Sequence, residues 1–358
     1  MKTLMIMAGG TGGHVYPAIA VADYLITHGW KIVWLCTEGG MENSLVANKP
    51  YEKAVIQMKG VRGKGILRLV YLPWHLSKAF VQSYQAIQNY QPNVLLGMGG
   101  FAAFPGGVMG RVLGKPLVIH EQNSVAGLTN KLLAKIATCV LVAFPYAFRK
   151  GVFTRKVQLV GNPVRSEITA ITRPEIRFAN RVGVLKLLII GGSLGAQALN
   201  EIVPLAIAKI PTDVRPQVIH QSGVKQFESL KANYIAAKVT ADCRAFIENI
   251  AQEYAEADLV ICRAGAMTIA ELSAVGVASI LVPFPFAVDD HQTTNAAYLV
   301  ASGAAELLQQ RDMSAENLSY LLQNLSRKKC LEMALKARKL GLPTATKAVG
   351  DICMELAI

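Results

Sequence analysis

The sequence has few charged and few aromatic residues for its 358-residue length, at 17% and 7%. Hydrophobic residues make up 52%, which excludes a disordered chain and favours well-packed cores. No apolar run reaches the ~18 residues of a membrane-spanning helix. The amino-terminal apolar run is short and ends at glycine, which indicates a first strand and no signal peptide. We therefore expect a cytoplasmic protein that is not integral to a membrane.

Paired cysteines are missing too. The six cysteines are scattered without any Cys-x-x-Cys spacing, and most lie in apolar runs. We interpret them as buried thiols in a reducing compartment, because disulfide scaffolds and zinc sites need paired or clustered cysteines.

Acidic residues are scarce, with 24 Asp and Glu against 37 Lys and Arg and a formal net charge of +13. Such an excess suits nucleic acid, an anionic membrane surface or phosphorylated substrates. The sequence has no zinc-finger spacing, RNP motif or basic heptad array, so we expect no nucleic-acid partner. A basic enzyme without any such partner remains an alternative.

Short apolar segments alternate with helix-length segments along the whole chain. The apolar segments are mostly continuous, as in parallel strands buried on both faces, and the alternation predicts βαβ units. The fold class expected is α/β, with two Rossmann-like, doubly wound domains that face a cleft and join near residue 163. Pro343 breaks the last helical pattern, so residues 345–357 are expected to form a separate helix. The expected strands are 4–8, 31–36, 53–58, 93–98, 116–120, 139–144, 156–161, 186–190, 216–220, 243–247, 258–262 and 278–282.

Three glycine-rich turns follow expected strands. They are GGTGGH at residues 9–14, GMGGFAAFPGG at 97–107 and GGSLG at 191–195. A glycine turn at the carboxyl end of a strand presents backbone N–H groups and the positive end of the next helix, which suits anions. A turn with only a packing role is one alternative. A P-loop is excluded, because no turn has Gly-x-x-x-x-Gly-Lys-Ser/Thr.

A dinucleotide site is a second alternative for the first turn. That site needs Gly-x-Gly-x-x-Gly and an acidic residue about 20 positions later. The first turn lacks the third glycine, although Glu38 partly meets the acidic requirement.

Polar segments follow several other strands. They are HEQN at 120–123, Arg165, CRAGAMTIAE at 262–271 and DDHQTTN at 289–295. Loops at the carboxyl ends of parallel strands form the ligand site of open α/β sheets. Each segment alone could be a helix cap, but their joint placement favours one binding site.

These segments resemble the MurG family, the N-acetylglucosaminyltransferases of glycosyltransferase family 28 that make the lipid-linked disaccharide of bacterial peptidoglycan. The resemblance runs in order from residue 5 to about 295, with a similar tail. It implies the GT-B architecture, in which the terminal helix returns to the first domain. The implied domains are 1–163 completed by 344–358, for acceptor and membrane, and 164–343, for UDP-GlcNAc. The matching segments are 7–14, 60–65, 96–100, 120–123, 161–165, 191–193 and 262–271.

The resemblance implies inverting transfer of GlcNAc from UDP-GlcNAc to the muramoyl O4 of undecaprenyl-diphospho-muramoyl-pentapeptide (lipid I). The product is lipid II, so roles in cell-wall growth, cell shape and cell division follow. Departures from the family pattern are residues 101–104, Leu194 and His291, which affect local contacts rather than the reaction. The implied substrate contacts are Ile247 with uracil, Glu271 with ribose, Ser193 and Arg165 with diphosphate, Gln292 and Asn123 with GlcNAc, Ala266, Met267, Thr268, Ile269 and Ala270 beside phosphates and sugar, and Thr11, Gly12 and Gly13 facing sugar and acceptor.

Glycosyl transfer builds negative charge on the leaving UDP, and the site must stabilise that charge. Asp289 and Asp290 are adjacent rather than spaced as Asp-x-Asp, so we expect no metal site and no cofactor. Arg165, Ser193 and a helix N-terminus are expected to stabilise the charge instead. The acceptor hydroxyl needs a base near neutral pH, for which His14 is one candidate and Glu121 the other.

Residues 51–80 combine six basic residues with many apolar ones and a single acid. We expect Leu76, Phe80, Tyr84 and Ile87 to pack inward on one helical face, whereas residues 66–74 are harder to bury. This composition favours peripheral contact with an anionic leaflet at the cytoplasmic face of the inner membrane. A core helix with a basic outer face is the alternative. Other cell-wall synthesis proteins are further expected partners.

Two other functions stay open. One is a different enzyme of UDP-GlcNAc on the same fold, such as a 2-epimerase, which needs no lipid-facing surface. The other is a non-catalytic nucleotide-binding scaffold, which would show no turnover.

Overall fold

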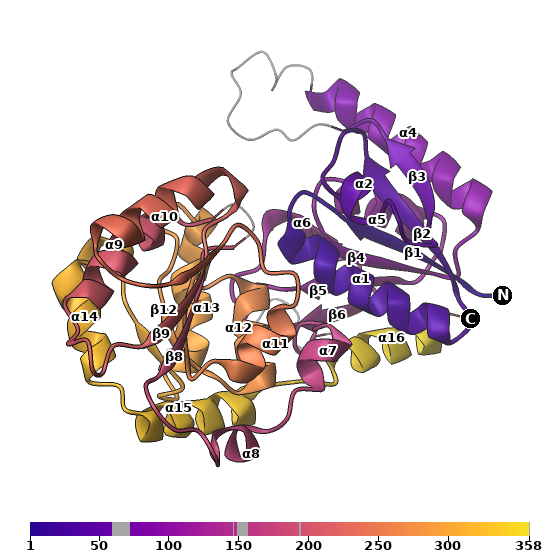
Figure 1. Cartoon of the computed structure of the whole chain (residues 1–358). Helices are drawn as coiled ribbons and strands as arrows, with labels where there is room; N and C mark the ends of the chain where they lie inside the picture. Colours follow the sequence, from indigo (N-terminus) through magenta and orange to yellow (C-terminus); the bar gives the residue numbers. More distant parts are fainter. Residues whose placement is uncertain (59–71, 146, 149–156, 193–194, 358) are drawn as a thin grey trace. The chain divides into compact units, whose positions relative to one another are not determined.

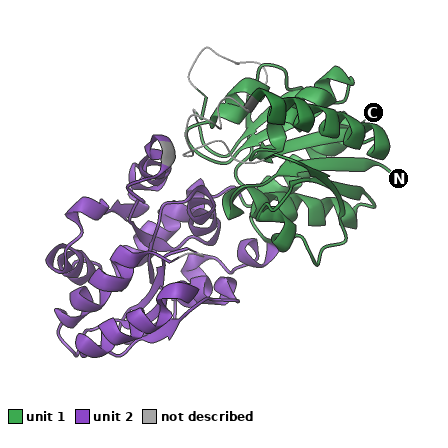
Figure 2. Cartoon of the chain, turned by 90° about the horizontal axis from the view of Figure 1, so that it is seen from above, with its two compact units in different colours: residues 1–165, 343–358 green, residues 166–342 purple. Residues whose placement is uncertain are grey.

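The computed structural model describes residues 1–58, 72–145, 147–148, 157–192 and 195–357. Within it the chain forms two compact units (Figure 2). Unit 1 comprises Met1–Arg165 and Pro343–Ile358, and unit 2 comprises Ser166–Leu342. The joint lies after Arg165, where the sequence placed it after residue 163.

Unit 1 contains a seven-stranded sheet of order β3-β2-β1-β4-β5-β6-β7, with every described pair parallel. Its strands are β1 (Thr3–Ala8), β2 (Lys31–Thr37), β3 (Glu52–Ile56), β4 (Val94–Gly99), β5 (Leu117–Glu121), β6 (Cys139–Val142) and β7 (Val157–Leu159). Its helices are α1 (Gly12–Thr27), α2 (Glu42–Leu45), α4 (Leu72–Tyr90), α5 (Ala103–Val112), α6 (Leu128–Leu133) and α16 (Ala345–Leu356).

Strand β1 shows why the unit-1 strands read as continuous apolar runs. Its side chains alternate between the two faces of the sheet, and both faces are covered. Leu4 and Ile6 join the core formed with α1 and α16, whereas Met5 and Met7 join the core formed with α4 and α5.

Unit 2 contains a six-stranded sheet of order β10-β9-β8-β11-β12-β13, again parallel throughout its described pairs. Its strands are β8 (Lys186–Ile190), β9 (Gln217–Gln221), β10 (Asp242–Arg244), β11 (Leu259–Cys262), β12 (Ala278–Leu281) and β13 (Ala305–Leu307). Its helices are α7 (Ser166–Thr169), α8 (Pro174–Phe178), α9 (Gln197–Ala208), α10 (Phe227–Ala236), α11 (Ile250–Glu256), α12 (Ala266–Val275), α13 (His291–Val300), α14 (Ala315–Gln323) and α15 (Arg327–Leu340).

The expected α/β class and all twelve expected strands are confirmed, with end shifts of a few residues. The sequence analysis missed β13, which is only three residues long and has a glutamate at its centre. In each sheet the first three strands follow one another outward to one edge, and the fourth strand (β4 or β11) then pairs with the free side of the first (β1 or β8). The switch points therefore lie between β1 and β4 and between β8 and β11, where doubly wound sheets bind ligands.

The buried face of helix α4 differs from the expected one. Ile87 is fully buried and Leu76 and Phe80 are half-buried, but Tyr84 is 43% exposed. The buried positions nearest to it are Ser83 and Ala86, so the inward face is rotated by about one residue from the expected one.

The terminal helix α16 belongs to unit 1, as expected, and packs on α1 (Figure 1). Val349 and Cys353 are fully buried in the core that also contains β1 side chains. The Tyr24 hydroxyl on α1 donates to Asp351 at 2.8 Å. A Cβ at Gly350 would lie 2.6 Å from Tyr24 Cε1, so this crossing depends on glycine.

We predict that Gly350→Ala lowers the free energy of unfolding by about 1–3 kcal/mol through overpacking, although alanine usually stabilises a helix by ~1 kcal/mol. The same substitution in a Tyr24→Ala background should be stabilising, because the clash is gone. Urea denaturation of the four proteins measures both effects. A stabilising Gly350→Ala in the wild-type background would contradict the close packing of α1 and α16.

Candidate functional site

In unit 1, the two glycine turns at the switch point lie against each other. The Gly9 N–H donates to the Gly99 carbonyl at 3.2 Å. Gly100 has φ of +90°, and a Cβ there would lie 2.5 Å from the Gly9 carbonyl oxygen. The second turn therefore needs glycine both for its backbone conformation and for this close approach.

A buried carboxylate, which the sequence analysis missed, supports the first turn. Glu42 on α2 is fully buried and accepts from Thr37 N at 2.8 Å, Thr37 Oγ1 at 2.7 Å and Gly10 N at 3.3 Å. A Cβ at Gly9 would lie 2.8 Å from its Cδ. The four-residue helix that carries Glu42 gives no periodic signal in the sequence.

His14 lies in the first turn of α1 and is half-buried. Its Nδ1 is 2.9 Å from Gln122 Oε1, and its ring lies so close to Gly99 that a Cβ there would be 2.9 Å from Cε1. Gln122 Nε2 is in turn 3.1 Å from His120 Nδ1. The structure thus brings His14 together with the HEQN segment, in which the sequence analysis assigned no individual role to His120 or Gln122.

Glu121, the other candidate base, is the last residue of β5 and is 2% exposed. Its Oε1 accepts from Asn123 N at 3.0 Å and Nδ2 at 3.4 Å. Its Oε2 accepts from Gly127 N at 3.0 Å and Asn130 Nδ2 at 2.8 Å. Four donors to one buried carboxylate hold the loop between β5 and α6.

The other expected residues of unit 1 lie at the same edge of the sheet, except Arg165, which lies at the carboxyl end of residues 1–165 of this unit. Thr11 and Gly13 are exposed, Gly12 opens α1, Asn123 follows β5 and Arg165 ends the unit, half-buried.

In unit 2, the glycine turn after β8 is tied to the next strand. A Cβ at Gly195, whose φ is +77°, would overlap the Ser222 carbonyl oxygen. Gln221, which is 4% exposed, donates through Nε2 to Gly192 O at 3.1 Å. Its Oε1 accepts from the Ile247 backbone N–H at 3.2 Å. Gln221 therefore links the glycine turn to the expected uracil position, a role that no sequence signal indicated; Ser193 lies outside the described residues.

Helix α12 begins at Ala266, and its N-cap Gly265 supplies no side-chain hydrogen bond. Its first turn carries the partial positive charge of a helix N-terminus. Met267, Thr268 and Ala270 are half-buried, whereas the Ile269 side chain is fully buried in the core. The Ile269 side chain is therefore a core residue, and its backbone N–H donates to the Gly265 carbonyl at 3.0 Å. One turn further, Glu271 accepts from the Tyr254 hydroxyl at 3.1 Å.

The loop after β12 lies beside the start of α13. Gln292 Oε1 accepts from Phe284 N at 2.9 Å, and the buried Asn295 donates to Ala264 O at 3.3 Å. Arg263 donates to the carbonyls of Val282 and Pro283 and to Gln310 Oε1. These bonds hold the loops at the carboxyl ends of β11 and β12, and burial lowers the pKa of Arg263.

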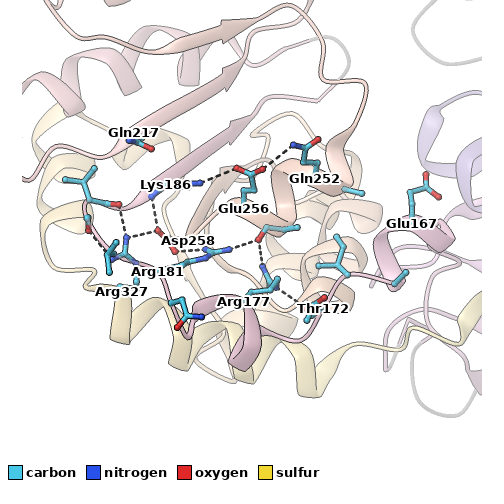
Figure 3. A pocket seen from close by; sticks show the side chains of 18 residues that line it. Glu167, Thr172, Arg177, Arg181, Lys186, Gln217, Gln252, Glu256, Asp258 and Arg327 are labelled. Carbon is cyan, nitrogen blue, oxygen red and sulfur yellow. Dashed lines mark hydrogen bonds and ion pairs between the residues drawn. The ribbon is translucent and has the colours of Figure 1, made fainter.

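The opposite, amino-terminal edge of the unit-2 sheet has a different character. A pocket of about 750 Å³ there is lined by Arg177, Arg181 and Arg327 around the fully buried Asp258 (Figure 3). Arg181 and Arg327 pair with Asp258 at 2.6 and 3.2 Å, and Arg177 donates to five backbone carbonyls. These guanidinium groups hold the carboxyl ends of α11 and α12 and the segment before β8, so the three arginines have a structural role.

Family models match both units. The glycosyltransferase family 28 N-terminal domain matches residues 4–142, and the glycosyltransferase family 28 C-terminal domain matches residues 186–349. The chain belongs to glycosyltransferase family 28.

Curated relatives in this family match the whole chain. Proteins of Nitrosospira multiformis and Dechloromonas aromatica are 52% and 54% identical to it, each over 99% of this chain and 98% and 99% of their own lengths. Both are named UDP-N-acetylglucosamine--N-acetylmuramyl-(pentapeptide) pyrophosphoryl-undecaprenol N-acetylglucosamine transferase.

Solved structures support the GT-B fold. The MurG of Acinetobacter baumannii is 40% identical, with a TM-score of 0.87 over 99% of this chain and 100% of that chain. A UDP-N-acetylglucosamine 2-epimerase has a TM-score of 0.64 at 11% identity, over 97% and 94% of the two chains. The second match shows the shared fold alone.

We predict that Glu121→Gln lowers the free energy of unfolding by about 1–3 kcal/mol, because an NH₂ group would face backbone N–H groups that now reach an oxygen. Thermal unfolding measures this, with the exposed Glu38→Gln as the matched control. An unchanged Tm would contradict the loop-holding role.

Proposed function

We propose that this chain transfers GlcNAc from UDP-GlcNAc to undecaprenyl-diphospho-muramoyl-pentapeptide, with inversion at the anomeric carbon. The observation that carries the proposal is the full-length similarity to relatives named for this reaction, at 52–54% identity. The three glycine turns and the polar segments 120–123, 262–271 and 289–295 lie within the regions that the family models match.

The donor binds at the carboxyl edge of the unit-2 sheet. The turn at Gly192 and the first turn of α12 supply backbone N–H groups and a helix N-terminus for the diphosphate, joined by Ser193. Ile247 holds the uracil, Glu271 the ribose and Gln292 the sugar. Backbone N–H groups and a helix N-terminus that are in position before the reaction stabilise charge on the leaving UDP without rearrangement.

His14 removes the proton from the acceptor hydroxyl. It lies on the first glycine turn of unit 1, and imidazole is the side chain that proteins most often use as a general base. Glu121 is the weaker candidate, since both of its oxygens already accept two hydrogen bonds inside its own loop. We therefore assign proton transfer to His14 and loop support to Glu121.

The wild-type protein should release UDP only when lipid I and UDP-GlcNAc are both present. His14→Ala should lower kcat by roughly 10²–10⁴-fold, which is the usual contribution of a general base. The KM for UDP-GlcNAc should change little. His28→Ala, at the exposed end of the same helix, is the control. Unchanged turnover in His14→Ala would refute the base assignment. A 2-epimerase would instead convert UDP-GlcNAc without lipid I, and that result would refute the transferase.

Unit 1 meets the membrane through α4 and the segment before it. The outer face of α4 exposes Trp74 at 73%, Val81 at 57% and Tyr84 at 43%, with Lys78 also exposed. Large apolar side chains beside a cation suit the surface of an anionic leaflet. The expected contacts at 66–71 lie outside the described residues, and among the described helices none is long and apolar enough to cross a bilayer. We place the enzyme at the cytoplasmic face of the inner membrane, with other cell-wall synthesis proteins as further partners.

Trp74→Ala should weaken binding to anionic vesicles by about 10- to 150-fold, since burial of a large apolar side chain contributes roughly 1.5–3 kcal/mol. Vesicle co-sedimentation measures the change. Ile235→Ala, at a 76% exposed position on α10 of unit 2, serves as the control. Equal effects of the two substitutions, or equal binding to neutral and anionic vesicles, would contradict this contact.

A further inference from the structure

A continuous row of polar groups runs from the backbone beyond β7 to His14, entirely within unit 1. His120 Nε2 is 2.8 Å from Gly161 O, Gln122 Nε2 is 3.1 Å from His120 Nδ1, and Gln122 Oε1 is 2.9 Å from His14 Nδ1. His120 and Gln122 are 0% and 1% exposed. Because water is excluded from them, each of these groups must find its partner in the row.

The first end of the row defines the state of His120. The Gly161 carbonyl can only accept, so His120 Nε2 must carry a hydrogen. Burial lowers the pKa of His120 to about 4, so the ring is neutral near pH 7. A neutral imidazole has one N–H, and His120 Nδ1 is therefore an acceptor.

The next member, Gln122, is oriented by two acceptors. Its Nε2 lies near His120 Nδ1 and also 3.2 Å from His120 O, which can only accept. A flipped amide would place oxygen against oxygen, so the NH₂ group faces His120 and Oε1 faces His14. Asn130 and Asn162 fix the backbone here, donating to His120 O at 3.2 Å and Gln122 O at 3.0 Å.

We infer that His120 and Gln122 are positioning residues that place the proton of neutral His14 on Nδ1 and leave Nε2 as its basic nitrogen. Since Gln122 Oε1 can only accept, His14 Nδ1 must donate. Gly99 adds a steric constraint, because its missing side chain lets the His14 ring lie flat against the second glycine turn. The inference rests on the proposed role of His14 as the base, and it names the atom that takes the proton.

Long-range ¹⁵N–¹H NMR of the histidine-labelled full chain tests the inference directly, because protonated and lone-pair ring nitrogens have different ¹⁵N shifts. The His14 signals are identified by their loss in His14→Ala. We expect the Nδ1–H form to predominate near neutral pH, without added substrate. A predominant Nε2–H form would overturn the inference even if His14→Ala proved inactive. Conversely, a fully active His14→Ala would overturn the base role while leaving the tautomer measurable.

Two substitutions separate positioning from packing. Gln122→Met keeps the length of the side chain but removes the acceptor, so the Nε2–H form should increase and kcat should fall by about tenfold, the weight of roughly one hydrogen bond. In Gln122→Glu the carboxyl proton would face the two acceptors of His120 and leave an acceptor oxygen toward His14 Nδ1, so this variant should keep the Nδ1–H form and a higher kcat than Gln122→Met.

The KM for UDP-GlcNAc should stay constant in both variants. Equal losses of kcat with an unchanged tautomer would show that Gln122 only packs, and would overturn the inference. If Gln122→Met fails to fold, the wild-type spectrum and the Gln122→Glu variant still decide.

Discussion

At the carboxyl edge of the sheet in each unit, two loops approach so closely that a Cβ atom on the glycine would clash with the neighbouring main chain. Gly100 against Gly9 in unit 1 and Gly195 against Ser222 in unit 2 bring neighbouring loops within hydrogen-bonding distance of each other. Buried side chains then hold these loops by hydrogen bonds. Glu42 accepts from the Gly10 N–H in unit 1, and Gln221 donates to the Gly192 carbonyl in unit 2. Backbone N–H groups held in this way need no rearrangement to meet an anion, and this is the property that transfer from a sugar diphosphate requires.

The two units hold the loops at their sheet edges with different kinds of side chain. In unit 1 the carboxylates of Glu42 and Glu121 are buried among N–H donors, and they order loops rather than react. In unit 2 an amide, Gln221, and a guanidinium, Arg263, do the equivalent work. These four residues therefore support loops, and of the two candidate bases His14 is the better placed.

Much of this architecture follows from the sequence. Continuous apolar runs predict buried parallel strands because both faces of each sheet are covered, as Leu4 and Met5 on opposite sides of β1 show. The glycine turns and the HEQN segment lie at the carboxyl edges of the sheets, as expected from their places after apolar strands. The supports escape such analysis: Glu42 and Gln221 act across 32 and 29 positions on Gly10 and Gly192, and no local pattern encodes those distances. The expectation that Tyr84 packs inward was wrong, because helical periodicity alone cannot choose between two adjacent faces of a helix when both carry apolar residues.

The terminal helix has a consequence for how the protein is made. Val349 and Cys353 complete a core whose other members come mainly from the strands of unit 1 and α1, yet they follow the whole of unit 2 in the chain. The first unit must therefore wait, with one apolar surface uncovered, while all of the second unit is synthesised and free to fold. Removal of α16 would be expected to harm the opposite end of unit 1, and a newly made molecule keeps this apolar surface exposed to aggregation until α16 has been synthesised.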